Sequence, residues 1–238
     1  MSKVREASGG GTVVEVPADR VAGWFDRFGA RHGGIAHTDL AAGRVAVLAD
    51  DGASAELAVP FGPLPLSADE PAGRRPGLVI GPLVEHLSRS RRIGLVLVRL
   101  GGHSVGVTES GRIVVSATDR KPVHGRSAAG GWSQQRFARR RAGQARVALR
   151  AAADDIHRVL GPRTGELDAV LLGGDRRALD ELRGDPRLAP VFALALPRVL
   201  DVPEPRRAGL DEAAVRATGV EILVREPQAE PAAEHERA

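Results

Sequence analysis

The apolar and polar positions of the first sixty residues follow two periods. Residues Val13–Val16 are typical of a short strand, and a helix is expected after Pro17 because apolar residues recur there at steps of three and four. These apolar positions are Val21, Trp24, Phe25 and Phe28. Two further stretches, Arg44–Ala49 and Ser54–Phe61, alternate on either side of an Asp-Gly turn, which predicts a hairpin. We therefore expect a flexible start over residues 1–12 and a small β-α-β-β unit over residues 13–66.

A second pattern begins after Gly62–Pro76, a stretch rich in proline and polar residues that indicates a domain boundary. Leu78–Leu87 predicts a short helix, and three strands separated by glycine-containing turns follow it. The three strands are Ile93–Leu100, Ser104–Glu109 and Arg112–Thr118. They lead into a long polar loop, Asp119–Ser133, and long loops of this kind inside compact domains are usually functional or disordered.

The loop is followed by the best-specified helix of the chain, which ends at Gly161-Pro162. Its apolar residues alternate between steps of four and three, and this spacing predicts one apolar face that packs on a sheet. The face comprises Ala138, Ala142, Ala145, Leu149, Ala152, Ile156 and Leu160.

The last third of the chain predicts a crossover unit with a parallel strand pair. A strand over Leu167–Leu172 runs through Gly173-Gly174 into a helix that ends near Leu182, and Asp175 is expected to cap that helix. The turn lacks the Lys-Ser/Thr pair and the glycine spacing of a phosphate-binding loop. Two more apolar runs follow, with a helix between them. The last residues of the chain are too polar to form a core, so a disordered tail is expected there. The runs are Pro190–Pro197 and Gly219–Val224, the helix is Leu210–Ala217, and the disordered tail is 226–238.

The composition of the chain excludes several kinds of functional site and bears on where the protein is expected to be found. The chain has no cysteine, so disulfides, thiolate catalysis and cysteine-based zinc sites are ruled out. Its seven histidines are scattered without metal-ligand spacing, so we expect them to be hydrogen-bonded or exposed, and we expect neither metal nor cofactor. No stretch reaches the ~20 apolar residues that span a bilayer. Residues Met1–Thr12 lack the apolar segment of a secretory signal, so a cytoplasmic protein is expected.

Positive charge is concentrated on one segment. The chain as a whole carries 34 basic and 30 acidic side chains, whereas Asp119–Arg150 holds nine basic residues and only the acid Asp119. Such a local excess is the footprint of a polyanion binder, usually nucleic acid; a solvated helix face in an arginine-rich protein is the alternative. With 3% aromatic residues and no tyrosine, base stacking has little support, so contacts to phosphate and shape are expected.

The junction of loop and helix carries the sharpest motif. It runs Gly130-Gly131-Trp132-Ser133-Gln134-Gln135, followed by Arg136-Phe137-Ala138-Arg139-Arg140-Arg141, with Arg126 upstream in the loop. This sequence resembles the catalytic loop and helix of the class I release factors of eukaryotes and archaea, in which Gly-Gly-Gln-Ser precedes Arg-Phe-Ala-Arg. Trp132 stands where that family has its glutamine. Gly-Gly-Trp-Ser-Gln is similar to the bacterial relatives of this domain, and the chain resembles the actinobacterial VLRF-type peptidyl-tRNA hydrolases over about residues 80–225. We therefore expect a release-factor-like catalytic domain over residues 77–225.

The resemblance implies a fold, a reaction and partners. The fold is α/β (α+β mixed), a ribonuclease-H-like mixed sheet with flanking helices, and the partners are the large ribosomal subunit and peptidyl-tRNA. The mobile loop would enter the peptidyl transferase centre and promote attack of water on the ester that joins the nascent peptide to tRNA. We expect codon-independent rescue of stalled large subunits, because no stop-codon-reading module is recognisable. The sequence does not fix the oligomeric state, and a monomer is expected.

Roles can be assigned to the motif residues from their chemistry. A glutamine amide is neither a useful acid nor a useful base near neutral pH, so Gln134 as first choice, or Gln135, would orient the water. Gly130 and Gly131 allow the backbone to lie close to RNA. Trp132 either wedges against a base or anchors the loop, and Ser133 is expected to cap the helix. The remaining site candidates are phosphate-binding arginines: Arg126, Arg136, Arg139, Arg140 and Arg141.

Two other functions stay open at this point. Loss of glutamine at the position of Trp132 favours a non-catalytic ribosome or RNA binder. A ribonuclease-H-like fold would also allow an RNA nuclease, although the aspartates show no metal-binding cluster in the sequence. These aspartates are Asp119, Asp154, Asp155, Asp168 and Asp175.

Overall fold

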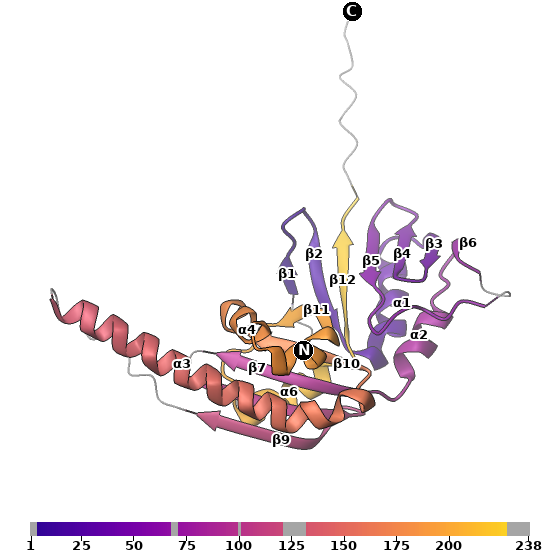
Figure 1. The fold of residues 1–238 in the computed structure, drawn as a ribbon. Coiled ribbons are helices and arrows are strands. Elements are labelled where there is room, and N and C mark those ends of the chain that lie inside the picture. Colours follow the sequence, from indigo (N-terminus) through magenta and orange to yellow (C-terminus); the bar gives the residue numbers. More distant parts are fainter. Residues whose placement is uncertain (1–3, 68–70, 100, 121–131, 228–238) are drawn as a thin grey trace, which may run out of the picture. The chain divides into compact units, whose positions relative to one another are not determined.

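The protein folds into two compact units, each with its own sheet. The computed structural model describes residues 4–67, 71–99, 101–120 and 132–227, and the side chains of residues 120 and 132–141 fall outside that description. Residues up to Arg89 and those from Thr218 onward form the first unit, and Ser90–Ala217 form the second. Among the described residues the first unit has a seven-stranded sheet and the second a five-stranded sheet (Figure 1).

The sheet of the first unit combines strands from both ends of the chain. Its order is β1 (Val4–Glu6), β2 (Thr12–Val16), β12 (Val220–Arg225), β5 (Ser54–Ala58), β4 (Arg44–Ala49), β3 (Ile35–Ala41) and β6 (Gly73–Pro76). Each described pairing in it is antiparallel. A 3-10 turn η1 (Ala18–Arg20) leads into helix α1 (Val21–Arg31), and helix α2 (Gly81–Ser88) follows β6.

The core of this unit lies between the two helices and one face of the sheet. Phe25 of α1 and Leu83 of α2 are fully buried against strand residues such as Val47. Trp24 stacks on Phe28 with ring centroids 5.5 Å apart, so the apolar stripe predicted for this helix is confirmed. Burial of these side chains supplies the main driving force for folding of the unit.

The bounds of the first unit differ from the expected ones. β1 is paired to β2, although residues 1–12 were expected to be flexible. β3 was missed because its side chains alternate poorly between apolar and polar: His37 and Asp39 lie opposite the face that buries Thr38. β6 lies inside the stretch read as a boundary, and α2 was placed in the following domain.

The largest correction concerns the strand at the end of the chain. It was assigned to the catalytic domain, but β12 pairs with β2 and β5 of the first unit. The expected domain over 77–225 therefore becomes a compact unit over Ser90–Ala217. Strand pairing between distant segments leaves no local signal in the sequence, which explains the error.

The second unit holds the loop-and-helix motif. In chain order its elements are β7 (Arg92–Arg99), β8 (Gly102–Glu109), β9 (Arg112–Arg120), α3 (Trp132–Leu160), η2 (Gly161–Glu166), β10 (Ala169–Gly174), α4 (Arg176–Arg183), η3 (Pro186–Leu188), α5 (Ala189–Ala193), β11 (Ala195–Leu200) and α6 (Arg207–Arg216). The strand order is β11-β10-β7-β8-β9.

This second sheet is mixed, as expected. β7, β8 and β9 form an antiparallel meander, while β10 is parallel to both β7 and β11. The carboxyl ends of β7, β9, β10 and β11 therefore lie at one edge of the sheet, here termed the carboxyl edge. The strands predicted over the central apolar runs are confirmed as β7 and β10, and both are almost wholly buried.

Helices cover both faces of the second sheet. α3 and α4 share a core with Val105 and Val107 of β8, whereas the intervening Gly106 faces α6. A Cβ at Gly106 would lie 3.0 Å from Leu210 of α6, so glycine lets that helix approach closely. The Gly173-Gly174-Asp175 turn is a packing turn with a helix cap: Asp175 accepts hydrogen bonds from the amides of Arg177 and Ala178.

Among the described residues, no helix is long and apolar enough to span a membrane.

Candidate functional site

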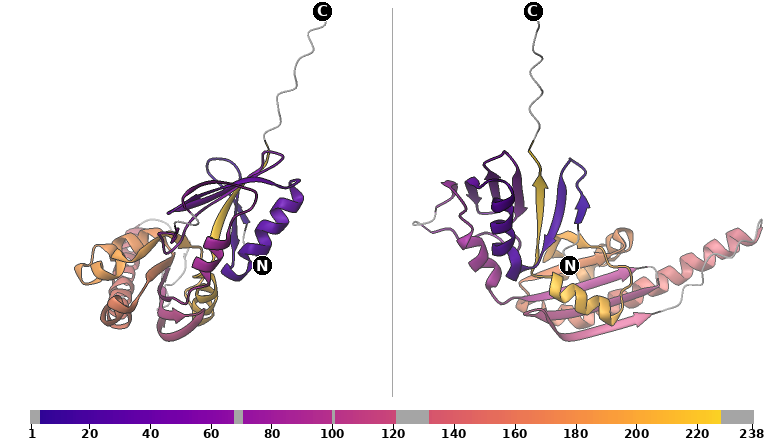
Figure 2. Two further views of the ribbon diagram at one scale, coloured as in Figure 1. Left: turned by 90° about the vertical axis from the view of Figure 1, so that its right-hand side faces the viewer. Right: turned by 180° about the vertical axis from the view of Figure 1, so that it is seen from behind.

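Helix α3 is much longer than the sheet on which it packs. It contains 29 residues and measures about 43 Å at 1.5 Å per residue, whereas the eight residues of β7 extend about 26 Å. Its N-terminal half therefore projects past the carboxyl edge of the sheet, as the views from front and back both show (Figures 1 and 2). The helix crosses this edge near Ala145 and Leu149, which line a small apolar gap together with Val98 and Gly102.

The C-terminal half of α3 is built into the core. Ala152, Ile156 and Leu160 are buried, and Leu149 packs against the same core, which confirms the predicted apolar face up to this point. Ala142 belongs to the same periodic series but is exposed, because the helix has passed the end of the sheet there. Ala138 lies among the side chains that are not described.

A hydrogen bond to buried His103 ties α3 to β8. The Nε2 atom of His103 lies 2.8 Å from an oxygen of Asp155, and the other oxygen accepts a hydrogen bond of 2.7 Å from Arg158. Burial raises the pKa of Asp155, but the hydrogen bonds from His103 and Arg158 outweigh it and hold this pKa below its usual value. The carboxylate is therefore ionised at neutral pH and His103 donates the hydrogen bond, so the side chain positions the helix on the sheet.

A second link joins α3 to the segment before α5. Arg187 donates to Asp154 of α3 at 2.9 Å and to Asp185 at 2.7 Å. The hydrogen bond from Arg187 lowers the pKa of Asp185. Arg187 and Asp154 are about half exposed, so water screens their interaction and this link contributes little to stability. The packed half of α3 is thus held by a core and by two polar links.

The motif residues predicted from the sequence fall at the start of the projecting half. The backbone positions of Gln134 and Gln135 lie in the first turn of α3, and those of the arginines follow in the next two turns. These arginines are Arg136, Arg139, Arg140 and Arg141. Gly130, Gly131 and Arg126 lie outside the described residues.

Two residues assigned to the loop belong to the helix. Trp132 is the first residue of α3 and Ser133 the second, so the helix starts earlier than expected. Ser133 therefore does not occupy the position that precedes a helix, where a capping hydroxyl acts.

The positive character of α3 continues into its described side chains. Arg146 and Arg150 are exposed, while Arg158 is engaged with Asp155. Exposed guanidinium groups that continue along one helix suit contact with phosphates. Within the described part of the chain, no group of three or more His, Asp or Glu side chains could hold a metal ion. His32, His86 and His103 are each hydrogen-bonded, as expected for most histidines of the chain.

The sequence did not predict the residues that position the helix or those that line a pocket at the carboxyl edge. His103 and Asp155 are 52 residues apart, and nothing in the local pattern of either residue predicts their contact. Arg99 and Arg206 line a pocket at the carboxyl edge but come from segments that were read as a strand end and as a connection. The one sequence signal for a positioning residue was His103, a histidine that directly follows the Gly101-Gly102 turn.

A mixed sheet with a long basic helix that projects from its carboxyl edge is the arrangement expected of a release-factor-like domain. The family model described as "Actinobacteria/chloroflexi VLRF1 release factor" matches residues 91–223. The chain belongs to this family. Membership places it among release factors, and no curated protein matches it.

Solved structures similar to the chain include an archaeal translation termination factor, aRF1, with 13% identity and a TM-score of 0.41 over 72% of this chain and 51% of that one. Saccharomyces cerevisiae Dom34, described as a translation termination-like factor involved in RNA quality control, has 10% identity and a TM-score of 0.32 over 91% and 69%. Archaeoglobus fulgidus Pelota has 13% identity and a TM-score of 0.29 over 92% and 66%. The chain spans about half the length of the archaeal termination factor.

Proposed function

We propose that the protein is a codon-independent peptidyl-tRNA hydrolase that releases nascent peptides from stalled large ribosomal subunits. The observation that carries this proposal is the division of α3: one half is fixed to the sheet, and the other projects and begins with the Trp-Ser-Gln-Gln motif. A projecting helix delivers its first turn into a narrow site without moving the core. Family membership supports the same function. Acting on ribosomes, the protein would work in the cytoplasm.

The reaction requires little covalent chemistry from the protein. The oxygen of water bonds to the carbonyl carbon of the ester, the bond from that carbon to the ribose oxygen of tRNA breaks, and a proton from water ends on the ribose oxygen. The amide of Gln134, or of Gln135, holds the water through its carbonyl oxygen and NH₂ group, because an amide is neither a useful acid nor a useful base near neutral pH. Catalysis then depends on position and on stabilisation of the developing oxyanion.

The arginines hold the helix on RNA in this proposal. Positions 136, 139 and 140 follow the i, i+3, i+4 spacing that places side chains on one side of a helix. Further along the same helix, Arg146 and Arg150 are exposed. The resulting line of positive charge fits phosphate groups of ribosomal RNA or tRNA and does not read a base sequence.

The test uses purified large subunits that carry peptidyl-tRNA with separate labels on peptide and tRNA. We expect the wild-type protein to release peptide and leave the tRNA intact, and Gln134→Ala or Gln135→Ala to bind subunits without releasing peptide. Binding by the wild-type protein with no release would identify a non-catalytic ribosome binder, for which Trp132 is the favouring feature. A cleaved tRNA would identify a nuclease. Either result would overturn the proposal.

A further inference from the structure

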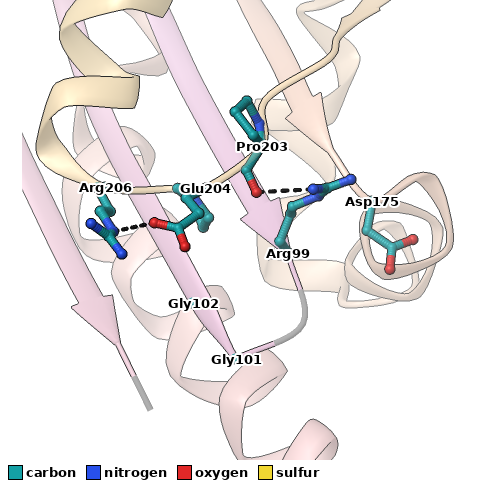
Figure 3. Close-up of a pocket in the computed structure, with 8 residues that line it drawn as sticks. Arg99, Gly101, Gly102, Asp175, Pro203, Glu204 and Arg206 are labelled. Atoms are coloured by element: carbon teal, nitrogen blue, oxygen red, sulfur yellow. Dashed lines mark hydrogen bonds and ion pairs between the residues drawn. The ribbon is translucent and has the colours of Figure 1, made fainter. Parts of the chain in front are cut away.

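The carboxyl edge of the second sheet contains a pocket that the release reaction does not use. Its volume is about 550 Å³, within the range of small-molecule sites. Arg99 at the end of β7, Asp175 after β10, and residues 203–206 after β11 line it (Figure 3). Ligands of open α/β sheets bind outside the carboxyl ends of the parallel strands, and the pocket lies at this place.

The walls of the pocket are fixed by hydrogen bonds. Ser104, which is fully buried, donates from its hydroxyl to the carbonyl oxygen of Pro205 at 2.8 Å. Arg99 donates to the carbonyl oxygen of Pro203 at 2.9 Å (Figure 3). Gly174 has a φ of +97°, and a Cβ there would lie 2.0 Å from the carbonyl oxygen of Val98, so the turn between β10 and α4 lies directly against β7. These contacts join the strands and loops that form the walls of the pocket.

Two arginines and two carboxylates line the pocket, so an anion would be held there by the hydrogen-bond donors of the arginines and not by a net positive charge. Only Oδ1 of Asp175 accepts from the amides of Arg177 and Ala178, and the carboxylate of Glu204 pairs with Arg206. The guanidinium of Arg99 has five N–H donors and makes one hydrogen bond among the described residues, so donors remain for a ligand. Two more exposed arginines, Arg176 and Arg177, begin α4 next to Asp175. A phosphate would meet guanidinium groups here and not helix amides, since Asp175 has taken those of Arg177 and Ala178.

The size and the acceptors of the pocket indicate more than a bare phosphate. Around the two arginines lie oxygen acceptors from Asp175, Glu204 and the backbone at Pro203. Such acceptors suit hydroxyl and amino groups, and a nucleotide offers both beside its phosphate. Gly101, which has a positive φ of +89°, and Gly102 also line the pocket. Because these two residues have no side chains, a flat ring can lie close to their backbone.

We propose that this pocket binds one nucleotide of RNA, with its phosphate on Arg99 and Arg206 and its sugar or base toward Asp175 and Glu204. The choice of RNA rests on the proposed function, because the same edge of the sheet bears the projecting half of α3. The pocket would hold one unpaired nucleotide of RNA next to the point where α3 leaves the sheet. This contact would fix the direction in which the projecting half of α3 points on the RNA.

The experiment is an NMR titration of the full-length protein with AMP, with a short single-stranded RNA, and with inorganic phosphate. We expect AMP and RNA to shift the backbone amide signals of Gly101, Gly102 and Gly174, and phosphate alone to shift them less and at higher concentration. The double variant Arg99→Gln, Arg206→Gln should bind AMP at least about tenfold more weakly, the loss expected from removing charge-assisted hydrogen bonds. Arg112→Gln is the matched control, because it removes an exposed arginine at the opposite end of β9.

Several results would overturn the inference. These are absence of shifts with either AMP or RNA, equal response to AMP and to phosphate, or equal affinity of the double variant and Arg112→Gln. The outcome is separable from that of the proposed function. Peptide release by wild type with no nucleotide in the pocket refutes only the pocket, whereas nucleotide binding without release refutes only the hydrolase.

Discussion

The two halves of helix α3 share one sequence period but have different surroundings. Ile156 is fully buried in the C-terminal half, whereas Ala142, which belongs to the same apolar series in the N-terminal half, is exposed. The polar links between described side chains follow the same division, since His103 and Arg187 contact Asp155 and Asp154 of the packed half. The comparison teaches that an apolar period specifies a helix and one face, while the length of the neighbouring sheet decides how much of that face is buried. The packed half therefore carries stability, and the projecting half is free for function.

The largest effect on stability should come from the packed half. Ile156→Ala removes three buried carbon atoms from the core and should lower the free energy of unfolding of the second unit by about 2–5 kcal/mol. Val147→Ala is the matched substitution on the exposed side of the helix and should change it by less than about 0.5 kcal/mol. Urea unfolding of both variants measures the difference. Equal losses would mean that the two positions do not differ in burial.

Two adjacent aspartates give a finer comparison. Asp155→Asn weakens the pair with buried His103 and should cost about 1–3 kcal/mol at pH 7. Asp154→Asn weakens only a surface contact with Arg187 and should cost less than about 1 kcal/mol. Thermal or urea unfolding of the two variants tests the order, and a greater loss for Asp154→Asn would contradict the positioning role of the His103 pair.

The contribution of Asp155 to the free energy of unfolding should be lost at acid pH. Because the pKa of this residue in the folded protein lies below its ordinary value of 3.8, its ionised form contributes fully above about pH 5 and the contribution is lost as the pH falls through 3.8 and below. The difference in unfolding free energy between wild type and Asp155→Asn should therefore shrink from pH 7 to pH 3. A constant difference over this range would show that ionisation of Asp155 does not stabilise the fold.

The smallest expected effects concern the arginines of the projecting half. Arg139→Ala and Arg140→Ala should each weaken binding to large subunits and reduce the slope of log affinity against log salt concentration by about 1. Arg158→Ala is the control, because that arginine is engaged with Asp155 in the packed half. An unchanged slope for the first two variants would mean that they do not meet phosphate.

The sequence predicted the local elements of the second unit well. The period of α3, the apolar strands β7 and β10, and the Asp175 cap each depend on residues close together in the chain. The hairpin of β4 and β5 was predictable for the same reason, since its turn residues set its register.

What could not be predicted depends on contacts between distant segments. β12 joins β2 and β5 across most of the chain, so the strand was assigned to the wrong unit. The His103 link and the pocket around Arg99 are likewise assembled by the sheet from separate segments. The motif at Gln134 was recognisable only through its resemblance to a family, because two glutamines at a helix start carry no distinctive local pattern.

The most direct test of the central claim is the rate of peptide release at saturating large subunits for Gln134→Ala and Gln135→Ala, with unfolding measured on the same samples. We predict that at least one variant loses about 10²–10³-fold in release rate, the range for removing one group that stabilises a transition state, while its unfolding free energy stays within about 0.5 kcal/mol of wild type. Wild-type release by both variants would contradict the assignment of chemistry to the projecting half of α3.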